Sequence, residues 1–412
     1  MSTNPQATTD GAGDGLDGLV VEGALHHALT PHFRALRAIK NRKRLHQSAL
    51  WAEIGPEVER VSAGVELGRH PAARLRDGAH ALRVAAWNLQ RGARFDELAG
   101  ALERDPVLRA ADVLLLVEVD DGLGRSANRH VARALAARLG MHYAFGAQYL
   151  TLEDDFLENP EGRENTLALA GNAILSRAPI RRVVNADLPE LRDKFSSSEK
   201  RLGKKRALVA ELALPDGPLV VSTCHLDSIA SSAQRARQLA AILDTVEALG
   251  VPRALVGGDF NTTTYDVSSP LSLARDLLHK LFVTGFRGTV DNYLTPDRRY
   301  ELPIFELLAA RGFAHDGLNE RARGTVVYDF NHPYAVDKVQ KRVGRLLTRW
   351  LLRRLRPWGG LVPARLDWFV GRGVTARACH TVAPPTDERG RPASDHAAIA
   401  VDIALGDTIV EG

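Results

Sequence analysis

The chain has 412 residues, enough for one large domain or two ordinary ones, and its 45% hydrophobic and 25% charged residues are typical of a soluble globular protein. The formal net charge of +4 allows an anionic substrate but does not by itself indicate nucleic-acid binding, because the effect of a charge depends on its place on the surface. Two cysteines are too few for a disulfide framework. The sequence has no run of about 18 consecutive apolar residues, so no segment is expected to span a membrane.

The N-terminal region shows no sign of secretion. The opening stretch MSTNPQATTDGAGDG has neither a basic nor an apolar segment, so we expect no secretory signal and a cytoplasmic protein. Residues 1–20 are polar and glycine-rich, which predicts a disordered tail, and residues 21–80 are predicted to form an N-terminal helical extension. Thr30 and Pro31 mark a helix start, and the segment 31–47 is expected to be one helix with a solvated basic face.

From Leu82 onward, short apolar runs alternate with helical stretches. Strands are predicted at 82–88, 112–118, 142–152, 168–176, 206–213, 218–226 and 253–258, and helices at 94–104, 125–139 and 231–249. The runs 112–118 and 253–258 are continuously apolar, as expected for strands buried on both faces. The alternation predicts one layered α/β domain over residues 81–405.

The interval 263–364 departs from this alternation and is interpreted as an irregular insert with one ordinary helix at 301–312. Its last part, 338–356, predicts a basic helix. One side would carry Val339, Val343, Leu346, Leu347 and Trp350, and the other side Lys338, Arg342, Arg345 and Arg349. Such a helix could pack on the core with its basic side in water, or contact a membrane or a nucleic acid, and the pattern leaves these alternatives open.

Polar residues at the ends of the apolar strands are the candidates for chemistry, because reactive groups in layered α/β folds collect there. They are Asn88 in AAWNLQRG, Glu118 in VLLLVEVDDG, His225 in VVSTCHLDS, Asp259 and Asn261 in GGDFNTTT, Asp367 in RLDWFV, and Asp395 and His396 in ASDHAAIAVDI. Each alone has a structural explanation, such as a turn, a helix cap or a hydrogen-bonded histidine. Glu118 is the hardest to explain in this way, since a buried carboxylate needs a partner or a metal ion.

Together, these residue types indicate a hard metal ion beside a phosphate group. Carboxylate and amide oxygens suit Mg²⁺ or Mn²⁺, and histidines next to such a site suit phosphate oxygens. Zn²⁺ would usually take Cys or more His, and Cys224 and Cys379 lack ligand spacing.

In their order along the chain, the motifs WNLQ, LLVEVD, GNAILSR, TCHLDS, GGDFN, RLDWF and SDHAAI resemble the endonuclease/exonuclease/phosphatase superfamily of DNase-like metal phosphoesterases, over about residues 82–404. The resemblance implies a four-layer α/β sandwich, in which two mostly antiparallel β-sheets pack face to face between outer helices. It also implies hydrolysis of a phosphodiester or phosphomonoester by activated water.

The resemblance implies roles for the strand-end carboxylates and amides. Glu118 and Asn88 match the main metal-binding pair, and Asp395 matches a further carboxylate at the metal. Asp259 matches the acid that orients or deprotonates the attacking water, and Asn261 matches the amide that holds phosphate or metal.

The resemblance also assigns the two histidines. His396 matches the histidine at the phosphate, and Asp367 matches the carboxylate that fixes its tautomer. His225 matches a second histidine found in the nuclease, sphingomyelinase and inositol-phosphatase branches. Histidines with pKa values near neutrality suit a phosphate clamp or an acid for the leaving group.

One departure from the family pattern concerns the partner of His225. The stretch MHYAFGAQYLTLE has no carboxylate at the position where the nuclease branch has an orienting glutamate, and only Gln148, Tyr149 and Glu153 are nearby. Arg206 is a candidate phosphate contact, but a structural arginine is at least as good an interpretation.

The substrate does not follow from the superfamily, because one fold hosts many functions. A nuclease acting on nucleic acid is the first hypothesis. A lipid-directed enzyme, like a sphingomyelinase or an inositol phosphatase, would use an apolar and basic element at a bilayer, and a soluble-metabolite phosphatase would need neither feature. The alternative of another class is an inactive binding or scaffold protein on the same fold.

Overall fold

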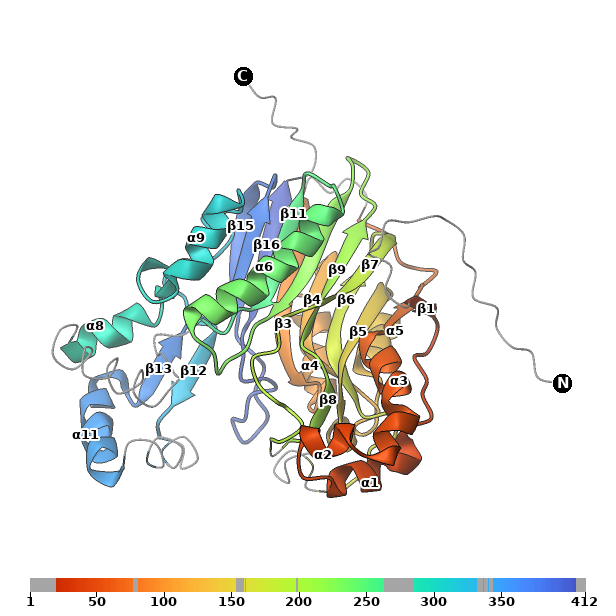
Figure 1. Cartoon of the computed structure of the whole chain (residues 1–412). Helices are drawn as coiled ribbons and strands as arrows, with labels where there is room; N and C mark the ends of the chain where they lie inside the picture. Colours follow the sequence, from red (N-terminus) through yellow and green to blue (C-terminus); the bar gives the residue numbers. More distant parts are fainter. Residues whose placement is uncertain are drawn as a thin grey trace.

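The computed structural model describes residues 20–76, 81–152, 159, 161–197, 199–262, 285–331, 336, 340 and 344–404. In this part of the chain, two β-sheets pack against each other and helices lie along both outer sides (Figure 1). The predicted disordered tail, except for Val20, is outside the described residues.

The larger sheet has nine strands. In spatial order they are β1 (Val20–Glu22), β2 (Val65–Gly68), β5 (His142–Thr151), β6 (Leu169–Ser176), β4 (Val113–Asp121), β3 (Ala81–Arg91), β16 (Ala398–Ala404) and β15 (Ala376–Val382), with β8 (Arg201–Gly203) paired to β5. Only the pairs β1–β2 and β3–β4 of this sheet are parallel in the described part of the chain.

The smaller sheet has five strands. In spatial order they are β14 (Asp367–Arg372), β11 (Ala254–Asp259), β10 (Leu219–His225), β9 (Arg206–Leu212) and β7 (Ile180–Asp187). Within it, β10 and β11 are parallel and the other pairs are antiparallel. The expected pair of mostly antiparallel sheets is therefore confirmed.

Three hydrophobic clusters hold the layers together. Side chains of both sheets, such as Leu115 and Phe369, form the cluster between them. The helices α3 (Ala49–Ala63), α4 (Phe95–Arg104) and α5 (Val131–Leu139) pack on the outer face of the larger sheet. The helices α6 (Ser232–Ala248) and α9 (Leu302–Ala310) pack on the outer face of the smaller sheet. The order helix, sheet, sheet, helix is the predicted four-layer sandwich.

Local sequence explains the best predicted elements. The run Val113–Val117 is buried on both faces, which its continuous apolar pattern predicts. Helix α6 begins at a capping box. The Ser231 hydroxyl accepts from the backbone N–H of Gln234, and the Gln234 side-chain oxygen accepts from the backbone N–H of Ser231. Helix α5 starts at Val131, later than predicted, because a 3-10 turn at Gly124–Ser126 precedes it.

The N-terminal segment differs from the expectation of one helix over 31–47, which is wrong. Helix α1 (Phe33–Ala38) ends where Ile39 becomes extended, and α2 (Arg42–His46) starts at a new cap, where Asn41 accepts from the Arg44 amide at 3.0 Å. The segment also contributes β1 and β2 to the larger sheet, and its apolar residues share the cluster under α3.

The insert forms a separate small layer beside the smaller sheet. Its described elements besides α9 are α8 (Gly285–Asn292), the turn at Pro296–Arg298, β12 (Val326–Asp329), α11 (Arg345–Leu355), the turn η5 (Arg356–Trp358) and β13 (Leu361–Ala364). We call β12, β13, α11 and η5 the arm; it lies at the lower left in Figure 1. None of the helices in the described ranges combines the length and hydropathy needed to cross a bilayer.

The predicted helix 338–356 corresponds to α11, while Lys338, Val339, Arg342 and Val343 lie outside the described residues. The alternative in which the apolar side packs on the core does not hold for Leu346, since Leu346 is 83% exposed. Helix α11 instead turns Thr348 and Leu355 inward, so Leu346 faces solvent together with the arginines.

Candidate active site

The ends of β3 and β4 bring Asn88 and Glu118 to one edge of the larger sheet. Both strands are irregular at these residues. The pairing of β4 with β6 shifts register between Leu116 and Val119, and Glu118 has a positive φ of 52°. The pairing of β3 with β4 shifts between Asn88 and Arg91. β-Bulges of this kind redirect side chains and occur next to active sites.

In the smaller sheet, strand register places three candidate residues in one row. His225 ends β10 and pairs with Asp259, which ends the parallel neighbour β11. Asp259 pairs in turn with Asp367, which begins the antiparallel strand β14. The three side chains therefore come from adjacent strands at the same edge of the sheet.

His396 joins this row from the loop before β16. Its Nδ1 lies 2.8 Å from Oδ2 of Asp367, and its backbone carbonyl accepts a 2.9 Å hydrogen bond from the Trp87 indole. Burial opposes a charge on the imidazole, but Asp367 and Asp259 outweigh burial and raise the pKa of His396 well above its usual value. His396 is therefore an imidazolium at neutral pH.

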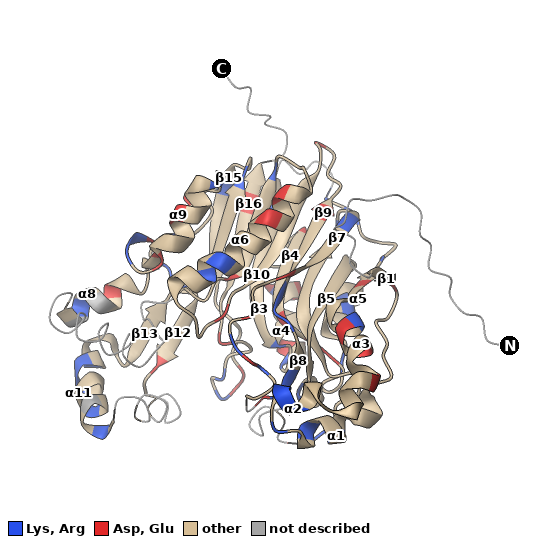
Figure 2. Ribbon diagram, viewed as in Figure 1, with Lys and Arg blue, Asp and Glu red and all other residues tan. Residues whose placement is uncertain are grey.

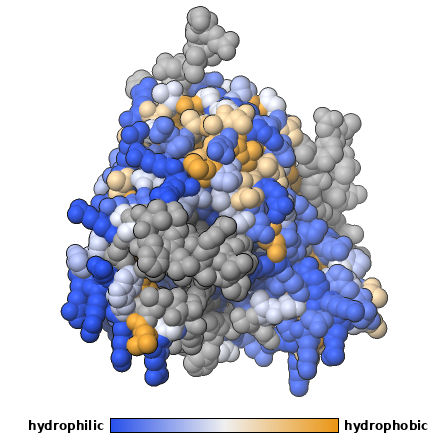
Figure 3. Space-filling model, turned by 60° about the vertical axis from the view of Figure 1, so that its left-hand side comes forward, coloured by the Kyte–Doolittle hydropathy of each residue, from blue (hydrophilic) through white to orange (hydrophobic). Residues whose placement is uncertain are grey.

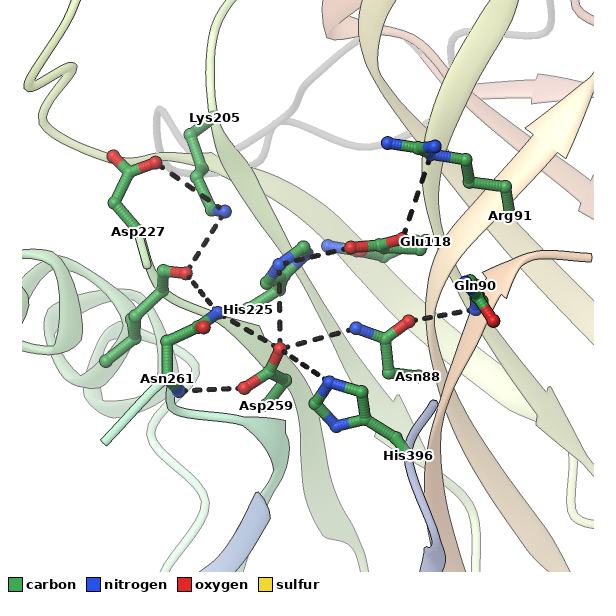
Figure 4. A network of polar contacts seen from close by, with 12 residues as sticks. Asn88, Gln90, Arg91, Glu118, Lys205, His225, Asp227, Asp259, Asn261 and His396 are labelled. Carbon is green, nitrogen blue, oxygen red and sulfur yellow. Dashed lines mark hydrogen bonds and ion pairs between the residues drawn. The ribbon is translucent and has the colours of Figure 1, made fainter. Parts of the chain in front are cut away.

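Asp259 is the point on which the site converges. Its Oδ2 accepts from the side-chain amide of Asn261 at 3.0 Å and from that of Asn88 at 3.3 Å, and lies 3.8 Å from Nε2 of His396. Burial, reinforced by Asp367 and opposed by His396, raises the pKa of Asp259 to about 7. Figure 4 shows the polar side chains of both sheets directed at this carboxylate.

Glu118 remains ionised although it is half-buried. Burial would raise its pKa, but the His225 ring, which is itself charged only at low pH, and the Arg91 guanidinium hold the pKa of Glu118 at about 2. The Arg91 Nε lies 4.0 Å from Oε2 of Glu118 and the His225 Nε2 lies 3.8 Å from Oε1. An ionised carboxylate in this position can accept a cation without first losing a proton.

The two histidines differ in charge. Burial and the nearby ammonium group of Lys205 lower the pKa of His225 to about 3, although Glu118 opposes them. His225 is therefore neutral at pH 7, and its Nε2 lies 3.8 Å from both Glu118 and Asp259. Between described residues, no hydrogen bond to the His225 ring is present.

Neither Gln148 nor Tyr149, the two described residues among those considered from the sequence, orients His225. The Gln148 side chain donates to the backbone carbonyl of Arg206, and the buried Tyr149 hydroxyl has no hydrogen-bond partner among the described residues. Glu153 lies outside the described residues.

Arg206 does not reach the site. Its guanidinium pairs with Asp187 and donates to the Asn185 carbonyl. The preceding residue, Lys205, points to the site instead (Figure 4). Lys205 is 6% exposed, and its ammonium donates to the Leu226 carbonyl at 3.3 Å. The run GKKRAL gave no basis for choosing among its three basic residues, because the way in which the chain enters β9 decides which of their side chains turns toward the site.

Asp395 lies at the rim of the site. It follows the buried Ser394 and is itself exposed, and its backbone amide donates to the Gln90 side chain at 3.2 Å. The Ser394 hydroxyl donates to the Asn88 carbonyl at 2.7 Å, which ties this loop to β3. Asp395 is thus close to the Asn88 side of the site.

The donor atoms present fit a divalent metal ion. Asp259, Asp367 and His396 offer ligand atoms within 4.8 Å of one another, and Asp367 Oδ1 is buried without a hydrogen-bond partner among the described residues. The charged His396 is hydrogen-bonded to Asp367 and offers no lone pair to a metal ion, so the carboxylate oxygens of this group and of Glu118 beside it are the donors for a cation. The Asn88 side chain directs its NH2 group to Asp259, and its oxygen accepts from the Gln90 backbone N–H at 3.0 Å. Carboxylate and amide oxygens are what Mg²⁺ or Mn²⁺ prefers.

The fold and the strand-end residues are those of an α/β-sandwich phosphoesterase. A family model described as the Endonuclease/Exonuclease/phosphatase family matches residues 85–396, and the chain therefore belongs to this family. The resemblance drawn from the ordered motifs is confirmed. No curated protein matches the chain.

The chain is also similar to solved structures. An endonuclease/exonuclease/phosphatase from Beutenbergia cavernae is 20% identical, with a TM-score of 0.50 over 81% of this chain and 74% of that one. D. rerio TDP2 complexed with a single-strand DNA product is 15% identical, with a TM-score of 0.43 over 79% and 99%. The 3'-5' exonuclease NExo from Neisseria meningitidis is 16% identical, with a TM-score of 0.44 over 78% and 100%.

Proposed function

We propose that the protein is a divalent-metal-dependent phosphoesterase that hydrolyses its substrate by attack of a water molecule. The observation that carries this proposal is the position of Asp259. Its Oδ2 lies 3.8 Å from both His225 and His396 and within hydrogen-bond distance of Asn88 and Asn261. A carboxylate with a pKa near 7 in this position can accept a proton from water at neutral pH.

The side chains have two kinds of role, proton transfer and charge stabilisation. Asn261 holds the Asp259 carboxylate through its amide and its backbone N–H, the latter at 2.8 Å. His396, kept charged by Asp367, can donate to a non-bridging phosphate oxygen as negative charge develops there. A Mg²⁺ or Mn²⁺ ion held by Glu118, Asn88 and Asp395 would add direct charge stabilisation at the phosphate.

Nucleic acid is the first substrate we propose. Basic side chains line the wall beside Glu118 and would attract a polyanion. Arg91 lies 4.0 Å from Glu118, the half-buried Arg201 lies nearby, and Lys205 lies on the other side of His225. A lipid phosphoester is the second candidate, favoured by the exposed Leu346 among the arginines of α11.

A hydrolysis assay tests the proposal. The full chain, freed of metal with EDTA, should hydrolyse bis-(p-nitrophenyl) phosphate only after Mg²⁺ or Mn²⁺ is restored. A panel of plasmid DNA, RNA oligomer, sphingomyelin and inositol phosphates then separates the substrate classes. Absence of hydrolysis with every metal and substrate would favour the inactive scaffold alternative.

Two variants test the assigned roles. Asp259→Ala and His396→Ala should each lower kcat on the order of 10²-fold or more, because each removes a group that acts on the reacting atoms. Circular dichroism and thermal unfolding should show that both variants are folded. Near-normal turnover in either variant would contradict its assigned role.

A further inference from the structure

The arm carries most of the exposed large hydrophobic side chains in the described part of the chain. Four of them lie on it, namely Val327, Tyr328, Leu346 and Leu361. Only Val20, Ile229 and Leu302 are found elsewhere in the described ranges. Leu346 is the most exposed, at 83%. Single exposed apolar residues are ordinary, but their concentration on one small element indicates a contact surface.

The arm also carries arginines without an ion-pair partner in the part of the chain that the structure describes. Helix α11 and η5 contain Arg345, Arg349, Arg353, Arg354 and Arg356, and the segment 344–364 has no acidic residue. None of the five arginines forms an ion pair with a described residue, and Arg354 lies over the ring of Trp350 at 5.5 Å. Some exposed arginines elsewhere, such as Arg138 with Glu103, have acidic partners, whereas others, such as Arg109 and Arg237, have none among the described residues. The arm is therefore complementary to an external anionic surface.

The apolar and basic side chains of α11 share one face. Arg345, Arg349 and Arg353 follow one another at four-residue spacing and are exposed, and Leu346 lies beside them on the solvent side. In Figure 2 the ribbon of α11, at the outer edge of the molecule, has blue stretches (Lys and Arg) and tan ones but no red. Figure 3 shows, at the height of α11, a hydrophobic patch bordered by hydrophilic side chains.

The arm is firmly joined to the candidate active site. Leu355 of α11 packs with Val326 and Val362 in a cluster of its own. Val326 forms a β-bridge with His396, and the Thr325 hydroxyl accepts from the amide of Asp367 at 3.1 Å. A surface bound by α11 would therefore lie next to the mouth of the site.

We propose that the arm docks on an anionic lipid bilayer through the arginines and Leu346 of α11. Arginines alone would serve a nucleic-acid backbone equally well, but phosphate binding gives no reason for a leucine that is 83% exposed. The boundary between lipid headgroups and acyl chains accepts both kinds of side chain. The proposal concerns where the protein binds and does not rest on its catalytic function.

Vesicle sedimentation with the full chain tests this proposal. The protein should sediment with phosphatidylcholine vesicles that contain phosphatidylserine at low salt, and release at high salt. The triple variant R345E/R349E/R353E should bind about 100-fold more weakly, since each basic residue near the surface contributes about fivefold. Leu346→Ser should bind about tenfold more weakly, because it removes apolar burial.

Matched variants control for charge and hydrophobicity. The triple variant K40E/K43E/R44E changes three exposed basic residues around α2, and Leu302→Ser changes an exposed leucine on α9; both should bind vesicles normally. All variants should retain hydrolysis of the soluble diester. Absence of sedimentation at every lipid composition would overturn the proposal. Arginine-dependent binding of a DNA oligomer, with vesicle binding unaffected by Leu346→Ser, would assign the arm to nucleic acid instead.

Discussion

His225 and His396 lie at the same distance, 3.8 Å, from one oxygen of Asp259, but their neighbours differ. Asp367 faces His396 at 2.8 Å, whereas Lys205 lies near His225. His225 is therefore neutral and His396 is charged. A charged imidazole beside a phosphate stabilises negative charge, while a neutral one can accept a proton or a hydrogen bond, so the two residues are not equivalent.

The Asp367→Asn variant tests this division. An amide cannot supply the charge that keeps His396 an imidazolium, and it can also favour the wrong tautomer. We expect kcat to fall on the order of 10²-fold or more with a smaller change in KM. Asp402→Asn is the control. Asp402 lies on β16, the strand that follows His396, and pairs with Arg83 of β3. Equal turnover in Asp367→Asn and the wild type would contradict the role of Asp367.

Lys205 gives a second prediction at this scale. Its ammonium is buried beside Asp227, with Asp259 and Glu118 near enough to act on its charge, so Lys205→Met should lower kcat/KM on the order of 10²-fold by removing a positive charge near the phosphate. The neighbouring Lys204 has a side chain that is 57% exposed and points to Asp187, so Lys204→Met should have normal kinetics. If Lys205→Met has normal kinetics as well, Lys205 only supports the loop at Asp227.

At the scale of elements, the end of β11 depends on Gly258. Its φ is +136°, and a Cβ there would lie 2.3 Å from the backbone oxygen of Cys224 on β10. The parallel register of β10 and β11, which sets His225 beside Asp259, therefore requires a residue without a side chain next to Asp259.

Gly258→Ala should accordingly destabilise the protein and displace Asp259. We expect the free energy of unfolding to fall by about 3 kcal/mol or more, since neither backbone can move easily. Gly250→Ala is the control, because Gly250 also has a positive φ of 70° but open space around its Cα, so only about 1 kcal/mol should be lost. Urea denaturation measures both values, and similar losses in the two variants would argue against the steric clash.

Elements were predictable where burial leaves a pattern in the sequence. β4 and β11 are buried on both faces and appear as continuous apolar runs. β7 and β15 lie at the edges of the two sheets, and their strands mix exposed and half-buried residues, so no alternation identified them. The prediction of one helix over 31–47 was wrong because the sequence pattern did not show the break at Ile39.

The candidate site was predictable as a set of strand ends and less so as a set of contacts. The ordered motifs indicated Asp259, which ends an apolar strand, and His396, which comes directly before one. The choice between Lys205 and Arg206 depends on which side chain the edge of β9 turns inward, and the neutrality of His225 depends on distances across strands. Neither property is encoded in spacing along the chain.

At the scale of the whole molecule, Glu66 joins the N-terminal segment to the larger sheet. It is fully buried on β2, where it accepts from the Leu25 amide at 2.7 Å and the Tyr143 hydroxyl at 2.5 Å. Burial would raise its pKa, but His130, Tyr143 and Arg133 hold the pKa of Glu66 at about 2. The ionised carboxylate thus links residues that precede the family match at 85–396 to β5 and α5 within it.

This linkage makes the stability of the molecule depend on pH. A carboxylate whose pKa falls from 4.5 in the unfolded chain to about 2 in the folded one stabilises the protein above pH 4.5 and loses this effect as the pH falls towards 2. Glu66→Gln should therefore lower the free energy of unfolding by about 3 kcal/mol at pH 7, and the difference from the wild type should shrink steadily below pH 4.5. Urea denaturation at several pH values measures it, with Glu103→Gln as the control, because Glu103 pairs with Arg138 on the surface. A difference that stays constant between pH 7 and pH 3 would show that Glu66 acts through packing alone and not through its charge.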